Sequence, residues 1–140
     1  MTGRTFFDTN VLVYLFDEDS PSKQARAREL FSAQARSGRI VLSLQVLQEF
    51  YVTVTRKLAR PLPAEEALSS LTQLSVLPLV AIDGALILRA AQLHQRDSLS
   101  FWDALIVQAA VEGNCKTLLS EDMQHGRRFG DLLIQNPFAE

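Results

Sequence analysis

Short apolar runs alternate along the chain with longer stretches of helical periodicity. The runs predict four strands at residues 5–7, 40–42, 77–82 and 116–119, and a short fifth strand at residues 132–134. The segments between them are long enough for crossover helices, so the alternation favours an α/β fold with a mainly parallel sheet. Pro78 cannot donate to a strand ladder, which predicts that the third strand lies at an edge.

Start and stop signals predict where the helices lie. A short helix is expected at residues 10–16, and Ser20 followed by Pro21 predicts the cap and first position of the next, with Gly38 at its exit. Ser43 is expected to cap a helix whose apolar stripe is Val46, Leu47, Phe50, Val54 and Leu58. Further helices are expected to begin at Pro63, Asp83 and Ser100, the last ending near Gly113.

Composition narrows the class of protein. The chain has 140 residues, of which 47% are hydrophobic and 21% charged, which fits one globular domain over residues 1–140. The net charge of −2 is not that of a protein that holds nucleic acid by bulk charge. A single cysteine, Cys115, excludes a disulfide framework and a cysteine-based zinc site. No apolar run is long enough to span a membrane, so we expect a cytoplasmic protein.

Four acidic residues stand out against this pattern. Asp8 and Asp122 follow predicted strands, and Glu49 and Asp103 fall among apolar positions of predicted helices. Each has an ordinary interpretation as a helix cap, a half-exposed helix residue or a turn acid. Ligands bind beyond the carboxyl ends of parallel strands, and clustered carboxylates are tolerated when a divalent cation neutralises them. As a set, they predict a Mg²⁺ or Mn²⁺ site.

Four segments carry a resemblance to a known family. Residues 6–14 (FFDTNVLVY) and 100–107 (SFWDALIV) resemble the first and third motifs of PIN-domain proteins. Residues 43–50 (SLQVLQEF) and 118–126 (LLSEDMQHG) resemble the second and fourth, and residues 136–138 (NPF) a typical ending. The likeness follows nearly the whole chain in order. It is nearest to the VapC-like toxins of bacterial type II toxin–antitoxin pairs.

The resemblance implies a fold, an activity and partners. The fold would be a three-layer α/β/α domain with strand order 3-2-1-4-5, and the activity Mg²⁺- or Mn²⁺-dependent cleavage of RNA phosphodiester bonds. It implies a homodimer and an inhibitory antitoxin, for which the helices with Leu68, Leu71 and Leu74 and at residues 11–16 are candidate surfaces. The metal-site acids would be Asp8, Glu49, Asp103 and Asp122, with Glu121 the alternative to Asp122 and with Asn10 and Ser120 as supporting polar residues.

Other residues have less specific expectations. Arg127 and Arg128, or Arg56 and Lys57, are candidates for RNA phosphate contacts. Phe101 and Trp102 are interpreted as core or subunit-interface residues rather than base-stacking ones, and Asp97 as a loop aspartate.

Alternatives to the toxin hypothesis differ in the residues that they need. A ribonuclease with a housekeeping role and a non-catalytic PIN-fold binding module remain open. A phospho-receiver domain would need a lysine after its fifth strand, and none follows Lys116. A haloacid-dehalogenase-like phosphotransferase would need an aspartate where Asn10 stands.

Overall fold

The computed structural model describes residues 3–139 and has a six-stranded sheet at its centre. The elements, in chain order, are β1 (Arg4–Phe7), α1 (Thr9–Tyr14), α2 (Pro21–Arg36), β2 (Ile40–Ser43), α3 (Leu44–Val52), the π-helical turn η1 (Thr53–Lys57), α4 (Ala64–Ser75), β3 (Leu79–Val80), α5 (Gly84–Arg96), α6 (Phe101–Glu112), β4 (Cys115–Leu119), β5 (Arg128–Phe129) and β6 (Leu132–Gln135).

The strand order is β3-β2-β1-β4-β6-β5. The first five strands in that order run parallel, and β3, the strand after Pro78, lies at one edge as predicted. The expected order 3-2-1-4-5 needs one correction. The expected fifth strand is β6, and β5 pairs with it antiparallel at the other edge. Two residues, Arg128 and Phe129, were too short a run to predict a strand.

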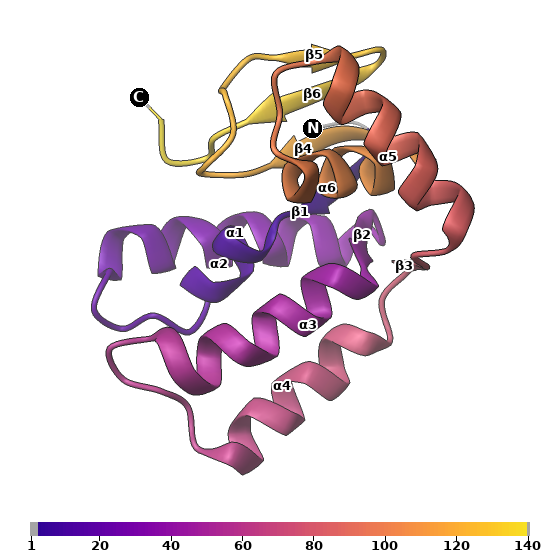
Figure 1. Ribbon diagram of the computed structural model, residues 1–140. Coiled ribbons are helices and arrows are strands. Elements are labelled where there is room, and N and C mark those ends of the chain that lie inside the picture. The colour runs from indigo at the N-terminus through magenta and orange to yellow at the C-terminus, as the bar shows by residue number, and fades with distance from the viewer. Residues whose placement is uncertain (1–2, 140) are drawn as a thin grey trace.

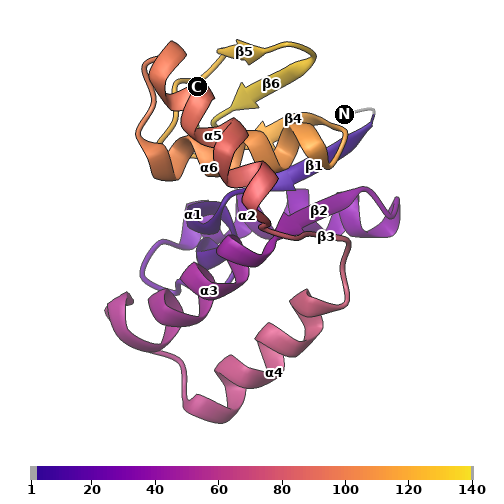
Figure 2. The same ribbon diagram turned by 45° about the vertical axis from the view of Figure 1, so that its right-hand side comes forward.

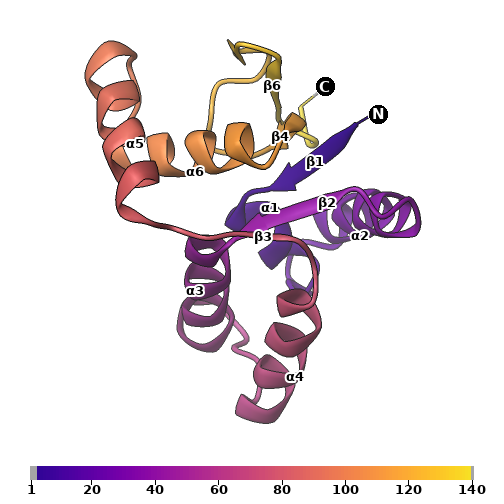
Figure 3. The same ribbon diagram turned by 90° about the vertical axis from the view of Figure 1, so that its right-hand side faces the viewer.

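Helices cover both faces of the sheet. Figure 3 shows α5 and α6 on one side of β1 and β2, with α2 on the other side. In Figures 1 and 2, α3 and α4 lie next to each other and extend away from the strands. The arrangement confirms the α/β fold that the sequence pattern predicts and the three-layer α/β/α form that the resemblance implies. No helix within residues 3–139 has the length and apolar character needed to cross a membrane.

The core fills the space between the sheet and the helices. Its largest fully buried side chains include Phe6 and Phe7 of β1 and Phe50 of α3. Gly113 lies where α6 turns into β4, and a Cβ there would lie 3.0 Å from Val41 Cγ1, so the Val41 side chain would have to shift by a few tenths of an ångström. Cys115 is buried, as expected.

Helix α2 begins as predicted, with Ser20 at its N-cap and Pro21 as its first residue, although the Ser20 hydroxyl donates to Asp17 and makes no bond to the helix. Other local predictions were wrong. The strand expected at 77–82 spans only Leu79–Val80. The helix whose apolar stripe was expected to reach Leu58 ends as an α-helix at Val52 and continues as the π-helical turn η1. The backbone of Leu58 is extended. The apolar residues of α1, Val11 to Val13, are buried in the core, so α1 offers them to no partner.

Candidate acidic active site

The first carboxylate of the site is placed by β1. Asp8 directly follows this strand and caps α1, accepting a hydrogen bond from the Thr9 amide at 2.8 Å. Its own amide donates to the Leu119 carbonyl of β4 at 2.9 Å. The register that pairs Phe7 with Leu119 brings Ser120 beside it, and the Ser120 hydroxyl donates to Asp8 Oδ2 at 2.8 Å. Asp8 is therefore buried with its oxygens held in place.

Glu49 reaches the same place from α3. Ser43 caps this helix by accepting from the Val46 amide, which fixes the helix at the end of β2. Thr9 donates its hydroxyl to Glu49 Oε1 at 2.8 Å, and Gln45, one turn earlier, donates to Oε2 at 3.3 Å. Thr9 thus links two of the acids, since its amide contacts Asp8 and its hydroxyl contacts Glu49.

Asp103 lies in the first turn of α6. Ser100 is the N-cap of this helix, as predicted, and accepts from the Asp103 amide at 3.1 Å. The half-buried Asp103 carboxylate lines the same cavity as Asp8 and Glu49. A local capping signal therefore places the third acid.

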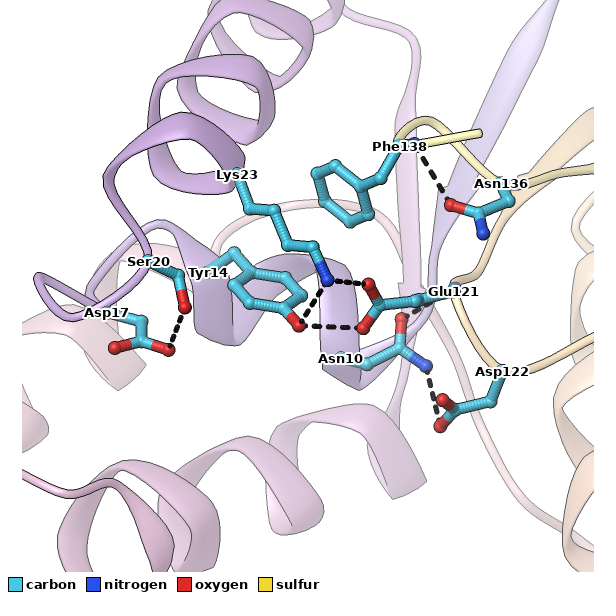
Figure 4. A network of polar contacts seen from close by, with 9 residues as sticks. All are labelled: Asn10, Tyr14, Asp17, Ser20, Lys23, Glu121, Asp122, Asn136 and Phe138. Carbon is cyan, nitrogen blue, oxygen red and sulfur yellow. Dashed lines mark hydrogen bonds and ion pairs between the residues drawn. The ribbon is translucent and has the colours of Figure 1, made fainter. Parts of the chain in front are cut away.

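Asn10 connects the fourth acid to the first. Its amide nitrogen donates to Asp122 Oδ2 at 3.1 Å (Figure 4). The same nitrogen donates to Asp8 Oδ2 at 3.4 Å. Its amide oxygen accepts from the Glu121 backbone N–H at 3.1 Å. One short side chain on α1 thereby fixes the loop after β4, which carries Asp122.

Glu121 points away from this cluster. Figure 4 shows its carboxylate between Tyr14 and Lys23, with the Tyr14 hydroxyl donating at 2.7 Å and Lys23 forming an ion pair. Lys23 also lies over the rings of Tyr14 and Phe138. Burial alone would raise the pKa of Glu121, but the hydrogen bonds from Lys23 and Tyr14 outweigh it, and the pKa is lowered. Of the two neighbouring acids, only Asp122 lines the cavity.

The acids open into one cavity of about 600 Å³. Its described lining carries five carboxylates, against which Lys57 is the one lysine or arginine; these acids are Asp8, Asp17, Glu49, Asp103 and Asp122. The other candidate phosphate contacts, Arg56, Arg127 and Arg128, do not line it. Arg127 instead donates to the Ser98 carbonyl and lies over the Phe129 ring. Asp97, paired with Arg96, is also outside the cavity.

Two of the carboxylates are hard to ionise where they stand. Burial raises the pKa of Asp8 to about 6, with repulsion from Glu49 and Asp103 adding to it and the bonds from Ser120 and Thr9 opposing it. The pKa of Asp103 is also raised, first by burial and then by repulsion from Asp122 and Glu49. The acids therefore repel one another across the cavity, which is the electrostatic situation that a bound cation relieves.

The donor set fits a hard divalent cation. All four acids offer oxygen, the ligand that Mg²⁺ and Mn²⁺ prefer, and the half-buried Asp103 and exposed Asp122 are free to adjust. Within residues 3–139, no three acidic, histidine or cysteine side chains are gathered closely enough to hold an ion as they stand. Holding one would require the carboxylates to turn inward together.

Sequence reasoning missed several residues of this site. Thr9 and Gln45 were quoted within the motifs but given no role, although each donates to a site carboxylate. Of the two places expected for Trp102, the core is wrong, because its side chain is 65% exposed and lines the cavity, whereas a subunit interface stays a prediction. Its place directly before Asp103 was the available signal.

Comparisons with known proteins agree with this architecture. Fold and site together define a class, an α/β domain with carboxylates clustered beyond its parallel strands. The PIN domain family matches residues 5–128, and the chain belongs to that family. A comparison with curated proteins found no match.

Three solved structures share the fold. A toxin–antitoxin complex from Klebsiella pneumoniae is 20% identical, with a TM-score of 0.69 over 96% of this chain and 98% of the other. VapC20 of Mycobacterium tuberculosis, a toxin that cleaves the sarcin–ricin loop, is 18% identical, with a TM-score of 0.65 over 84% and 91%. VapBC2 from Rickettsia felis, bound to a DNA fragment from its promoter, is 21% identical, with a TM-score of 0.67 over 94% and 97%.

Proposed function

We propose that this protein is a Mg²⁺- or Mn²⁺-dependent endoribonuclease and the toxin of a type II toxin–antitoxin pair. The observation that carries the proposal is the convergence of Asp8, Glu49, Asp103 and Asp122 on one cavity from four separate segments. Membership of the PIN family and the VapC fold support it.

The four carboxylates would hold the cation, with Asp8 and Asp103 as the inner ligands. When bound, the ion supplies charge that polarises the scissile phosphate and makes a water molecule more acidic. Ser120 and Thr9 orient Asp8 by donating to its two oxygens, and Thr9 and Gln45 do the same for Glu49. These donors hold Asp8 and Glu49, so the turning needed to gather the ligands would fall mainly on Asp103 and Asp122.

The chain's exposed groups would handle water and substrate. Asp122 stands at the exposed rim, where it can orient a water molecule for attack on phosphorus. Lys57, in the turn η1 that follows the helix carrying Glu49, lines the same cavity and is the cation placed to contact a neighbouring phosphate.

An apolar groove beside the acid cavity suits an inhibitory partner. It measures about 520 Å³, lies between α3 and α4, and is lined by residues that include Leu47, Tyr51 and Leu71. Gln48 and Val52 border both the groove and the acid cavity. An antitoxin segment with apolar residues followed by a basic one would complement both. A second copy of this chain remains a further proposed partner.

RNA cleavage by the purified protein tests the proposal. We expect cutting of cellular RNA with Mg²⁺ or Mn²⁺, none in EDTA, and none by the folded Asp8→Asn/Asp103→Asn variant purified in parallel. Cutting that persists in the variant would show a contaminating nuclease. A folded wild-type protein that cuts no RNA in a pool containing tRNA, rRNA and mRNA would contradict the proposed activity.

A further inference from the structure

Trp102 is a large aromatic side chain in an unusual place. It is the only tryptophan of the chain, and 65% of it is exposed to solvent. It lies in the first turn of α6, directly before Asp103, and it lines the acid cavity together with Asp8 and Glu49. An indole at the rim of a carboxylate cluster is explained neither by the core nor by the capping of α6.

The surroundings hold the indole without covering it. The Phe101 ring meets it edge to face, with centroids 5.4 Å apart and an interplanar angle of 69°. Phe101 is itself in edge contact with His94, at 6.4 Å. Gln45, which also holds Glu49, donates to the Trp102 carbonyl at 3.5 Å. Gln45 therefore contacts both Glu49 and the backbone of Trp102, and the indole remains accessible to solvent.

The negative charge of the cavity makes an uncharged contact with RNA useful. The described lining of the cavity carries five carboxylates and one lysine, Lys57, so it repels a polyanion. A bound cation would offset only part of that charge. Stacking of a base on an aromatic ring adds affinity that does not depend on charge, and it tolerates any base.

We propose that Trp102 is the platform on which a base of single-stranded RNA stacks while its phosphate chain enters the acid cavity. The inference rests on the proposed ribonuclease function. It specifies single-stranded RNA because a base must leave the helical stack before its face can meet a side chain. Since Trp102 and Asp103 are adjacent on α6, the stacked nucleotide would lie next to the one that is cut.

Intrinsic fluorescence gives a direct test, because the emission comes from one tryptophan. The probes are a ten-nucleotide single-stranded RNA of mixed sequence and an abasic ribose–phosphate chain of equal length, each mixed rapidly with the protein in Mg²⁺ and, separately, in EDTA. In Mg²⁺ we expect the RNA to change the emission of Trp102 and the abasic chain to leave it unchanged. No change with RNA that binds would overturn the proposal.

Substitutions at Trp102 and at a control position test whether an aromatic ring, and not merely a large exposed side chain, binds the RNA. We expect Trp102→Ala to weaken binding of labelled RNA about tenfold and to raise KM more than it lowers kcat. Trp102→Phe should restore part of the affinity, and Leu88→Ala, which trims a similarly exposed side chain on α5, should change nothing. Equal binding by Trp102→Ala and wild type would overturn the proposal.

The remaining outcomes distinguish this inference from the proposed function. Cutting that needs Mg²⁺ but is undiminished in Trp102→Ala would refute the platform and leave the nuclease intact. Emission that responds to RNA in a protein that cuts none would support the platform and refute the nuclease. Emission that depends on protein concentration and not on RNA would assign Trp102 to an interface between copies, and would overturn the proposal.

Discussion

At the scale of single residues, the burial of Asp8 has an energetic consequence. Its pKa of about 6 in the folded protein lies above the value of about 3.9 expected in the unfolded chain. The folded state therefore binds this proton more tightly, and ionisation of Asp8 destabilises the fold as pH rises. Well below pH 4 the carboxyl is protonated in both states, and its burial has no such effect.

Asp8→Asn should consequently stabilise the protein when no metal is bound. Asparagine keeps the shape and hydrogen-bonding capacity but cannot ionise. We expect the free energy of unfolding in EDTA to rise by up to about 3 kcal/mol at pH 7–8, and the gain to disappear near pH 4. Urea denaturation at the two pH values measures it. Equal stability of variant and wild type at pH 8 would contradict the burial argument.

Glu121 and Asp122 form a matched pair of adjacent acids with different surroundings. Asp122 faces the cavity, whereas Glu121 is held by Tyr14 and Lys23. We expect Asp122→Asn to slow RNA cleavage roughly 100-fold and Glu121→Gln to change it only a few-fold, since glutamine can still accept from Tyr14. Similar losses in both variants, measured as kcat/KM, would show that the orientation of the two acids does not decide their roles.

At the scale of elements, α2 supports the site from outside. Lys23 on this helix holds Glu121, and the Glu121 amide holds Asn10, which contacts Asp122. The support passes through partly exposed groups, with 43% of the Lys23 side chain and 22% of the Glu121 side chain open to solvent. Ion pairs in contact with water contribute little to stability. Its effect should therefore appear at the site and not in the melting temperature.

Lys23→Met tests that separation. We expect Mn²⁺ binding to weaken a few-fold with little change in the melting temperature. The control is Lys116→Met, because Lys116 contacts the highly exposed Asp131 outside the cavity. If both variants bind Mn²⁺ like the wild type, Lys23 does not position the loop after β4.

Capping residues in the sequence predicted the helices whose first turns are held by those same residues. Asp83 and Ser100 cap their helices as expected, because each accepts from an amide three residues on. Ser20 is the N-cap of α2 as expected, but its hydroxyl donates to Asp17 and makes no capping bond. The antiparallel strand β5 is two residues long and exists through its pairing with β6, which no local pattern reveals.

In the candidate site too, features fixed by local sequence were predicted, and features fixed by distant contacts were not. The four acids were predicted from their places after strands and within apolar helix faces, and the fold brings all four to one cavity. The choice between Glu121 and Asp122 was open because it depends on Tyr14 and Lys23, about a hundred residues away in the chain. Lys57 enters the cavity through the π-helical turn η1, which the regular helical period did not predict.

At the scale of the whole molecule, sheet order creates the site. β1 lies between β2 and β4, so the segments that follow these three strands meet at one edge, and α6 adds Asp103 from one face. No single segment carries more than a fragment of the site. The four carboxylates should therefore act together toward a cation, and not as independent surface acids.

Calorimetric titration of Mn²⁺ into the metal-free protein tests that claim most directly. We predict saturable binding to the wild type at pH 7.5, accompanied by a rise in melting temperature. The folded Asp8→Asn/Asp103→Asn variant should lose both effects, whereas Glu121→Gln should retain them. Mn²⁺ binding of equal affinity in the wild type and the double variant would contradict the claim that these carboxylates form one cation site.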